Sequence, residues 1–466
     1  MPTMMGLPNE ILISIIDATG PEDVVSFSTC CKLMYDLARD RLEEHKEKKR
    51  LLSKIFVNGD FLPFLLPFRD TNGNKDTDLK EFFSDKRNRS YPKAMDVTFN
   101  LEESGPLYED KFERQLESAM AAVHSMIALV GGEIVATEWG KDVKAGYPLA
   151  VFLWFLALLP NLEECEIRIF GYYHQTLSAN YSKIIRLMIE AALEQEENRL
   201  SYGGRLTKCT VDADFDRNGS IGESFLPFIM MLPKIRIIQG CCLDIEHLSW
   251  PFTDAVSPLV DLDLNGGINT ATLSNYVRGI RELKSFRYNF EDDFFVDHLD
   301  IDWEPCEIVS TLRQSAFRTL VSLDLTINLS RDLTWFDISP GIGSLRSFEV
   351  LETIHLHYIL LLEEVLIAHS ADEVDSAETS EILDEESLTK RQRLIDFLPS
   401  SVKTFQLEDI AIAEGEGVLD IFEGFPEHRV ERLPNLELIS LDTFYKTISQ
   451  VREICERAGV RINQAY

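Results

Sequence analysis

The sequence predicts an α/β protein in which three short amino-terminal helices precede a series of strand–helix units. Three observations lead to this fold class. Apolar residues recur at helical spacing near the amino terminus, and a string with apolar residues at alternating positions returns through the remaining chain. Amphipathic helical segments separate several copies of that string. A chain of 466 residues is long enough to form more than one domain.

The first expected helix is apolar around most of its circumference. In the segment LPNEILISIID, a broad stripe at helical spacing is formed by Ile11, Leu12, Ile15 and Ile16, and Ile13 widens it. A helix with this much apolar surface has to be buried on more than one side. One of those sides is expected to contact another chain.

Two more short helices are expected directly after the first. Pro21 and the acids that follow it favour a helix start at EDVVSFS, and CKLMYDLARD predicts a third helix. Helices this short cannot enclose all of their apolar side chains, although each buried Leu, Ile or Val contributes roughly 1.5–3 kcal/mol. The pattern predicts a docking module for another protein, and the alternative is a helical cap on the domain that follows.

The string from Leu7 to Ala38 resembles an F-box. The residues that match the family pattern, in the family's order, are Leu7-Pro8, Glu10, Ile11-Leu12, Ile15-Ile16, Val24-Val25, Cys31-Lys32 and Leu37-Ala38. The string departs from the pattern at Thr19, where Leu is usual, and at Met34, where Trp is common.

This resemblance implies that residues 1–45 dock onto the Skp-type adaptor of a cullin-based ubiquitin ligase. The adaptor contacts that it implies are Leu7, Pro8, Ile11, Leu12, Ile15, Val24, Val25 and Cys31. Residues 46–92 are expected to form a spacer and a polar, turn-rich linker. In the spacer, RDRLEEHKEKKRLLSKIF is expected to continue as a charged helix.

Residues 93–466 contain a recurring string of the form L-x-x-L-x-L. Its copies begin at Leu162, Leu206, Leu259, Leu283, Leu320, Leu351, Val402 and Leu436, and weaker copies begin at Ala94 and Ile235. Helical patterns lie between or after them, as in residues 111–130, residues 182–195 and YKTISQVREICERAG. A strand and a helix of this size cannot bury their own apolar faces, and stacking neighbouring units in a row solves that problem.

The repeated units resemble a leucine-rich-repeat solenoid of irregular period, which implies a binding domain for another protein. The alternative is a doubly wound α/β domain, which also alternates strands and helices but would need a phosphate loop or a similar site. The sequence contains neither G-x-G-x-x-G nor G-x-x-x-x-G-K-[ST].

On such strands, the residues between the leucines are expected to face the open side of the sheet. The candidate binding residues on that side lean acidic and favour basic groups on a partner. They are Asp261, Asp263, Arg287, Asp324, His355 and His357. The residues expected beside them include Glu164, Glu166, Arg168, Asn265, Asn289, Thr326, Gln406 and Glu408.

The composition argues against several classes of function. Asp plus Glu number 78 against 46 Lys plus Arg, a formal net charge of −32, which disfavours binding to nucleic acid or to an anionic membrane. The most membrane-like segment, YPLAVFLWFLALLPNL, falls short of the ~20 apolar residues of a spanning helix and predicts a buried helix. Without a signal peptide, the chain is expected in the cytoplasm, the nucleus or both, with its eight cysteines reduced.

No motif predicts catalysis, a metal or a cofactor. The string DFDRNGSIGESF, residues 214–225, matches a calcium loop in part, but Phe225 replaces the required glutamate, so a polar turn is expected. His355 and His357 alternate along one strand without an evident third ligand. The acidic insertion at residues 363–388 is expected to be a disordered loop. The alternatives for this insertion are a segment that attracts a basic partner electrostatically and a segment that is phosphorylated.

Together, the sequence features predict a substrate-recognition subunit of an SCF-type ubiquitin ligase that is not itself an enzyme. The amino-terminal module would dock the adaptor, and the repeats would hold an unidentified target protein near a ubiquitin-loaded enzyme. The alternatives are a non-degradative interaction scaffold built from the same two parts, and an α/β enzyme whose site no motif reveals.

Overall fold

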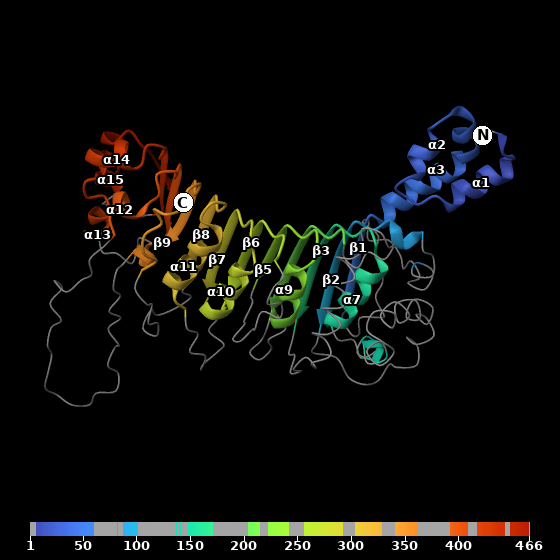
Figure 1. Ribbon diagram of the computed structural model, residues 1–466, viewed down its shortest axis with the longest axis horizontal. Helices are drawn as coiled ribbons and strands as arrows, with labels where there is room; N and C mark the ends of the chain where they lie inside the picture. The colour runs from blue at the N-terminus through green and yellow to red at the C-terminus, as the bar shows by residue number, and fades with distance from the viewer. Residues whose placement is uncertain are drawn as a thin grey trace. The chain divides into compact units, whose positions relative to one another are not determined.

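The computed structural model describes residues 6–59, 82, 87–100, 137, 139–141, 143, 148–170, 204–214, 222–241, 256–291, 303–328, 341–361, 392–408, 417–442 and 448–465. Within these residues, twelve strands form a parallel sheet in chain order from β1 to β12, together with eleven α-helices (Figure 1). The α/β class predicted from the sequence is therefore confirmed. The chain divides into two compact units, residues 1–218 with 231–235 and residues 219–230 with 236–466.

The first unit holds the amino-terminal helices and the first strands. Its elements are α1 (Asn9–Ala18), α2 (Val24–Ser28), α3 (Lys32–Leu52), β1 (Lys54–Gly59), the 3₁₀ helix η2 (Asn88–Ser90), β2 (Ala94–Asn100), α7 (Pro148–Leu158), β3 (Glu164–Phe170) and β4 (Lys208–Asp214). The three predicted amino-terminal helices are present. Helix α3 continues without a break past residue 45, so the expected boundary of the module falls inside it.

Strand β1 replaces the end of the expected spacer helix. The helix prediction for SKIF is wrong, because Lys54–Gly59 pairs in parallel with Ala94–Phe99 of β2. Ile55 and Val57 alternate toward the interior and are 0% and 3% exposed. Their β-branched side chains fit a pleated, half-buried surface better than a helix.

Helix α7 is apolar on every side, and the structure buries it as the sequence predicts. Every residue from Ala150 to Leu156 is at most 2% exposed. Such a helix belongs in the interior, because none of its faces carries the polar groups that favour contact with water. In the part of the chain that the structure describes, no helix combines the length and the apolar character needed to cross a membrane.

The second unit alternates strands with short helices. Its elements are α9 (Gly222–Met230), β5 (Ile237–Cys241), β6 (Asp261–Gly266), α10 (Thr270–Arg278), β7 (Ser285–Glu291), α11 (Pro305–Ala316), β8 (Ser322–Asn328), β9 (Thr353–His357), η4 (Tyr358–Leu361), α12 (Leu394–Phe397), β10 (Thr404–Glu408), α13 (Gly417–Asp420), α14 (Phe425–Arg432), β11 (Leu438–Asp442), α15 (Ile448–Arg457) and β12 (Arg461–Ala465). All ten copies of the recurring string, in both units, contain a strand, as predicted. Strand β12 was not predicted, because RINQA has one large apolar residue and no clear alternation.

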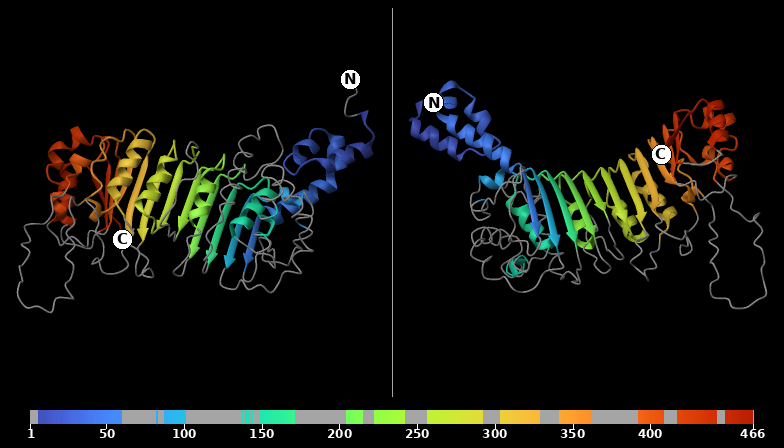
Figure 2. Two further views of the ribbon diagram at one scale, coloured as in Figure 1. Left: turned by 60° about the horizontal axis from the view of Figure 1, so that its bottom comes forward. Right: turned by 180° about the vertical axis from the view of Figure 1, so that it is seen from behind.

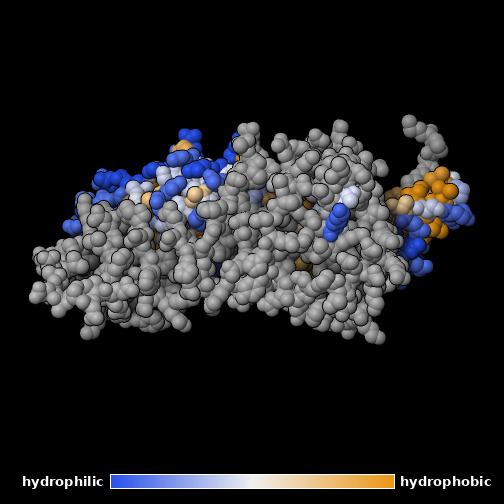
Figure 3. Space-filling view, turned by 90° about the horizontal axis from the view of Figure 1, so that it is seen from below, coloured by the Kyte–Doolittle hydropathy of each residue, from blue (hydrophilic) through white to orange (hydrophobic). Residues whose placement is uncertain are grey.

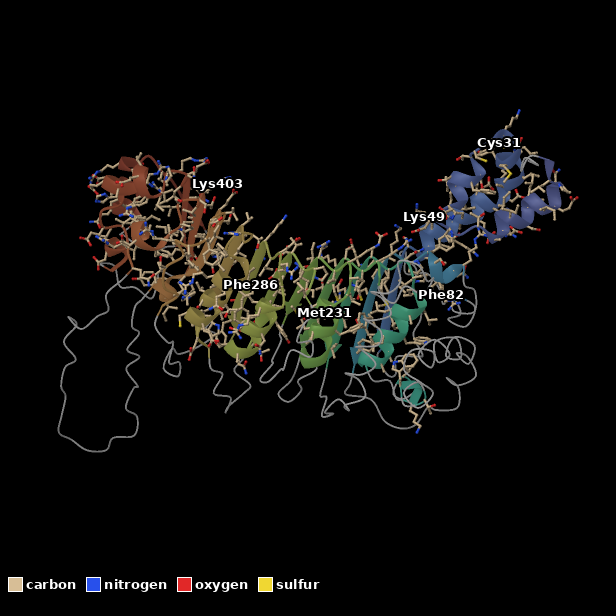
Figure 4. All side chains as sticks on the ribbon, in the orientation of Figure 1. Cys31, Lys49, Phe82, Met231, Phe286 and Lys403 are labelled. Atoms are coloured by element: carbon tan, nitrogen blue, oxygen red, sulfur yellow. The ribbon has the colours of Figure 1, made fainter. Side chains whose placement is uncertain are left out.

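The core of the second unit is a stack of apolar residues in register on its strands. Leu262 pairs with Phe286, and Phe286 pairs with Leu323. The stack continues from Leu323 to Ile354 and from Ile354 to Phe405. All five are 0% exposed, and Figure 4 labels Phe286 among them. Helices α10 and α11 lie over this side of the strands (Figure 1).

A repeated backbone contact joins consecutive strands at their amino-terminal ends. The carbonyl oxygen of Val260 accepts hydrogen bonds from the N–H groups of Lys284 and Ser285, at 2.8 and 3.1 Å. The carbonyls that accept two such bonds in the second unit are those of Arg236, Val260, Lys284, Val321, Glu352 and Lys403. Consecutive segments therefore stack through one recurring contact, although the connections between them differ in length.

Several predicted features lie outside the described residues. They are the helical patterns at residues 111–130 and 182–195, the acidic insertion at residues 363–388, and residues 215–221 of the string that resembles a calcium loop.

Candidate protein-interaction surfaces

The amino-terminal helices pack around a small apolar core of their own. Its members, which recur every four residues on α1 and α3, are Leu12, Ile16, Met34, Ala38 and Leu42. Residues four apart lie on one face of a helix, so the two helices bury one stripe each. An ion pair joins the same two helices, with Arg41 Nε 2.7 Å from Asp17 Oδ1.

Large apolar side chains remain exposed around this core. In the part of the chain that the structure describes, eight large apolar residues are exposed, and five of them belong to the amino-terminal helices and the turn before α1. We call these five the apolar surface: Leu7 (37% exposed), Ile11 (48%), Ile13 (40%), Val25 (45%) and Tyr35 (48%). Figure 3 shows apolar colour gathered over these helices.

The geometry of α1 explains why its flanks stay exposed. Successive residues turn by about 100° around an α-helix, so Ile11 and Ile13 lie on either side of Leu12. Leu12 faces α3, and one neighbouring helix covers only one stripe. The two flanks would need a further partner to leave water, and each exposed side chain offers such a partner an apolar contact.

The structure divides the eight implied adaptor contacts by exposure. The exposed ones are Leu7, Pro8, Ile11 and Val25, and Ile15 and Cys31 are half-buried. Leu12 and Val24 are 0% exposed. Both side chains are therefore closed to a partner in the free chain, and their contact with an adaptor stays a prediction. Figure 4 labels Cys31 on these helices.

A second candidate surface crosses the open face of β6 to β10. We call it the charge row: Asp263, Arg287, Asp324, His355 and Glu408. The strand register places Asp263 opposite Arg287, Arg287 opposite Asp324, and Asp324 opposite His355. Residues that alternate with the buried stack point to the opposite face of a sheet, so the row lies on the side away from α10 and α11.

Ion pairs connect the row from one strand to the next. Arg287 Nη1 is 3.3 Å from Asp263 Oδ2, and Arg287 Nε is 2.9 Å from Asp324 Oδ2. The other oxygen of Asp324 is 3.0 Å from His355 Nδ1, and His355 Nε2 is 2.8 Å from Glu408 Oε1. Negative and positive groups therefore alternate across five strands.

The surroundings of the row shift the pKa values of His355 and Asp263. Burial disfavours the charged form of His355, but Asp324 and Glu408 on either side favour it more strongly and raise its pKa to about 9. His355 is therefore cationic at neutral pH. Burial raises the pKa of Asp263 above its usual range, and Arg287 offsets this in part. Asp261 and Asp324 also oppose the ionisation of Asp263.

Five of the six candidate residues on the open face lie where the sequence predicts them. Asp261, Asp263, Arg287, Asp324 and His355 share that face, with Asp261 just outside the row. His357 is 1% exposed, and its Nδ1 accepts a hydrogen bond from the N–H of Ile359 at 3.2 Å. The expectation that His357 is open to a partner is wrong, because the chain turns into η4 directly after β9 and encloses the imidazole.

Glu408 completes the row although it was not among the six candidates. It reaches His355 from the next strand, 53 residues further along the chain. The sequence alternation places Glu408 on the open face, but it carries no signal that would identify the partner on the neighbouring strand.

Possible metal ligands and free thiols also occur among the described residues. Among them, no group of three or more His, Cys, Asp or Glu residues is arranged to hold a metal ion. The seven cysteines that the structure describes are free thiols. Burial raises the pKa of Cys455 to about 12, so this thiol is protonated and weakly nucleophilic at neutral pH.

Comparison with protein families and with curated proteins finds no match to this chain.

Proposed function

We propose that this chain is the substrate-recognition subunit of an SCF-type ubiquitin ligase, with the apolar surface as the site that docks a Skp-type adaptor. The observation that carries the proposal is the exposure of Leu7, Ile11, Ile13, Val25 and Tyr35 in a segment whose sequence resembles an F-box. Covering such side chains with a partner stabilises the complex by roughly 25 cal/mol per Å² of apolar area removed from water.

The strands support the second half of the proposal. Parallel strands that follow one another in chain order, joined by one recurring carbonyl contact, suit a leucine-rich-repeat-like solenoid. The open face of such a solenoid would hold the target protein. The adaptor would bring the cullin, and a ubiquitin-loaded enzyme would act on the held target through proximity. No side chain of this chain would then need to touch the reacting bond.

Binding of a purified Skp-type adaptor to the full chain tests the docking step. The double variant Ile11→Glu with Val25→Glu places two charges in the proposed interface, and we expect it to weaken adaptor binding by about a hundredfold or more. Val430→Glu is the matched control, because Val430 is 72% exposed on helix α14, outside the apolar surface. Absence of adaptor binding by the unmodified chain would refute the proposal.

Ubiquitin transfer separates a ligase subunit from a scaffold. In an assembly reconstituted from the chain, the adaptor, the cullin and a ubiquitin-loaded enzyme, a target bound to the strands should acquire ubiquitin. The Ile11→Glu, Val25→Glu variant should abolish transfer without changing target binding. If the adaptor binds but no bound protein is modified, the chain is a non-degradative scaffold.

A further inference from the structure

The open face of β6 to β10 is available to a partner. Among the described residues of the second unit, α10 and α11 cover the opposite side of these strands, and no helix of that unit lies over the face that carries the charge row (Figure 2, right). Its side chains retain contact with solvent: the Arg287 side chain is 57% exposed, that of Glu408 37% and that of Asp263 26%.

The face carries more negative than positive groups. Its carboxylates on β6 to β10 are Asp261, Asp263, Glu291, Asp324 and Glu408, and its cationic groups are Arg287 and His355. Around them, the uncharged polar residues include Ser285, Asn289, Ser322, Thr326 and Thr353. The surface therefore offers hydrogen-bond acceptors with an excess of negative charge and few apolar side chains.

We propose that this open face, centred on the charge row, docks a lysine- and arginine-rich segment of the target protein. The inference rests on the proposed function, since it names the chemistry of the target that the strands would hold. Such a segment offers positive charges that balance the excess of negative charge on the face.

The ion pairs within the row make the carboxylates ready for binding. Arg287 lies between Asp263 and Asp324, and His355 lies between Asp324 and Glu408, so each carboxylate is held in position before a partner arrives. A site that is already ordered loses less conformational entropy on binding. Because a carboxylate has two oxygens with several lone pairs, it can accept hydrogen bonds from a partner while it keeps its internal ion pair.

Charge complementarity decides the class of partner. The raised pKa of Asp263 reflects burial and the nearby Asp261 and Asp324, which Arg287 compensates in part, and an incoming cation would supply further compensation. The formal net charge of −32 also attracts basic partners over a distance and repels anionic ones.

Three labelled peptides of equal length test the proposal with the full chain: one rich in Lys and Arg, one rich in Ser and Gln, and one rich in Glu and Asp. The basic peptide should bind, and the other two should bind at least tenfold more weakly at about 0.15 M salt. The variant Asp261→Asn, Asp263→Asn should weaken binding of the basic peptide by about tenfold. Circular dichroism and the melting temperature show whether this variant folds.

A matched control separates a site from diffuse attraction to an acidic chain. The variant Glu282→Gln, Glu431→Gln removes the same number of charges at exposed positions outside strands β6 to β10, and it should bind the basic peptide like the unmodified chain. Equal losses in the two double variants, or equal binding of all three peptides, would overturn the proposal. Should the first variant unfold, Glu291→Gln on the same face replaces it, with Glu282→Gln as its control.

The two proposals fail separately. Peptide binding is measured without the adaptor, and the Ile11→Glu, Val25→Glu variant should bind the basic peptide normally. If the adaptor does not bind while the basic peptide docks on the open face, the chain is not a ligase subunit. The open face then remains a docking site for basic segments in a binding protein of another kind. If the adaptor binds while the peptide shows no preference, the docking surface fails alone.

Discussion

Ile11 and Leu12 are consecutive residues of helix α1 with opposite environments. Ile11 is 48% exposed, whereas Leu12 is 0% exposed and packs with Ile16 and Met34 in the core of the amino-terminal helices. Both are aliphatic residues of nearly the same size, so substitutions at these two neighbouring positions separate binding from stability.

Leu12→Ala should destabilise the amino-terminal helices by about 2–5 kcal/mol, because it removes buried methyl groups and leaves a cavity. Ile11→Ala should change the free energy of unfolding by less than about 1 kcal/mol, because its side chain already contacts water. Chemical denaturation followed by circular dichroism measures both. Equal destabilisation by the two substitutions would show that Ile11 is buried in solution.

The ion pairs of His355 should make stability depend on pH in the alkaline range. Its pKa is raised from 6.5 to about 9, so the stabilisation is fully present below pH 6.5 and is lost as the pH rises through about 9. We expect the difference in unfolding free energy between the unmodified chain and His355→Gln to shrink by about 2–3 kcal/mol between pH 6.5 and pH 10. Urea denaturation at several pH values measures this difference, and a constant difference would contradict the ion pairs.

Tyr288→Phe should cost about 1–3 kcal/mol although it removes a single oxygen atom. The Tyr288 hydroxyl is buried and donates to the carbonyl of Gly266 at 2.8 Å, and it accepts from the N–H of Ile268 at 3.1 Å. Phenylalanine leaves both backbone groups without this partner in the interior. Thermal unfolding of the variant measures the loss. Tyr35→Phe is the control, because Tyr35 is 48% exposed, and it should have almost no effect.

Gly424→Ala should destabilise the second unit by about 1–2 kcal/mol. Gly424 precedes helix α14 with φ of 69°, a left-handed conformation that L-residues disfavour. An added Cβ would also come within 3.3 Å of Ile395 Cδ1. Gly20→Ala is the control, since Gly20 has no positive φ and no atom within 4 Å of the added carbon, and it should be close to neutral. Equal melting temperatures for both variants would contradict the prediction.

Much of the fold could be predicted from local patterns. The alternation of buried Leu262 and Leu264 with polar Asp261 and Asp263 defines β6 from a few neighbouring residues, and the same holds for the other copies of the string. The apolar composition of YPLAVFLWFLALLPNL likewise predicted the buried helix α7. Such patterns are local, because the direction of the side chains repeats every two residues in a strand and about every 3.6 residues in a helix.

The candidate sites could be predicted in part. The open face of β6 to β8 was placed correctly, since alternation assigns each residue to one face of a strand. The burial of His357 could not be predicted in this way. Alternation places its side chain on the open face, but η4 begins at the next residue and encloses it. The local pattern predicts helix at the start of β1, because the preceding charged helical pattern runs directly into this strand and its pairing partner β2 lies beyond a long connection.

The sequence by itself determined the ten predicted strands, the buried helix α7 and an amino-terminal segment with more apolar surface than three short helices can hide. Tertiary structure decided which of those apolar residues stay exposed, Ile11 and Val25 rather than Leu12 and Val24. It also decided that Asp263 and Asp324 meet Arg287 across 24 and 37 residues of chain. The physical reason is that backbone periodicity acts over a few residues, whereas burial and charge pairing depend on which distant segments the stacking of the strands brings side by side.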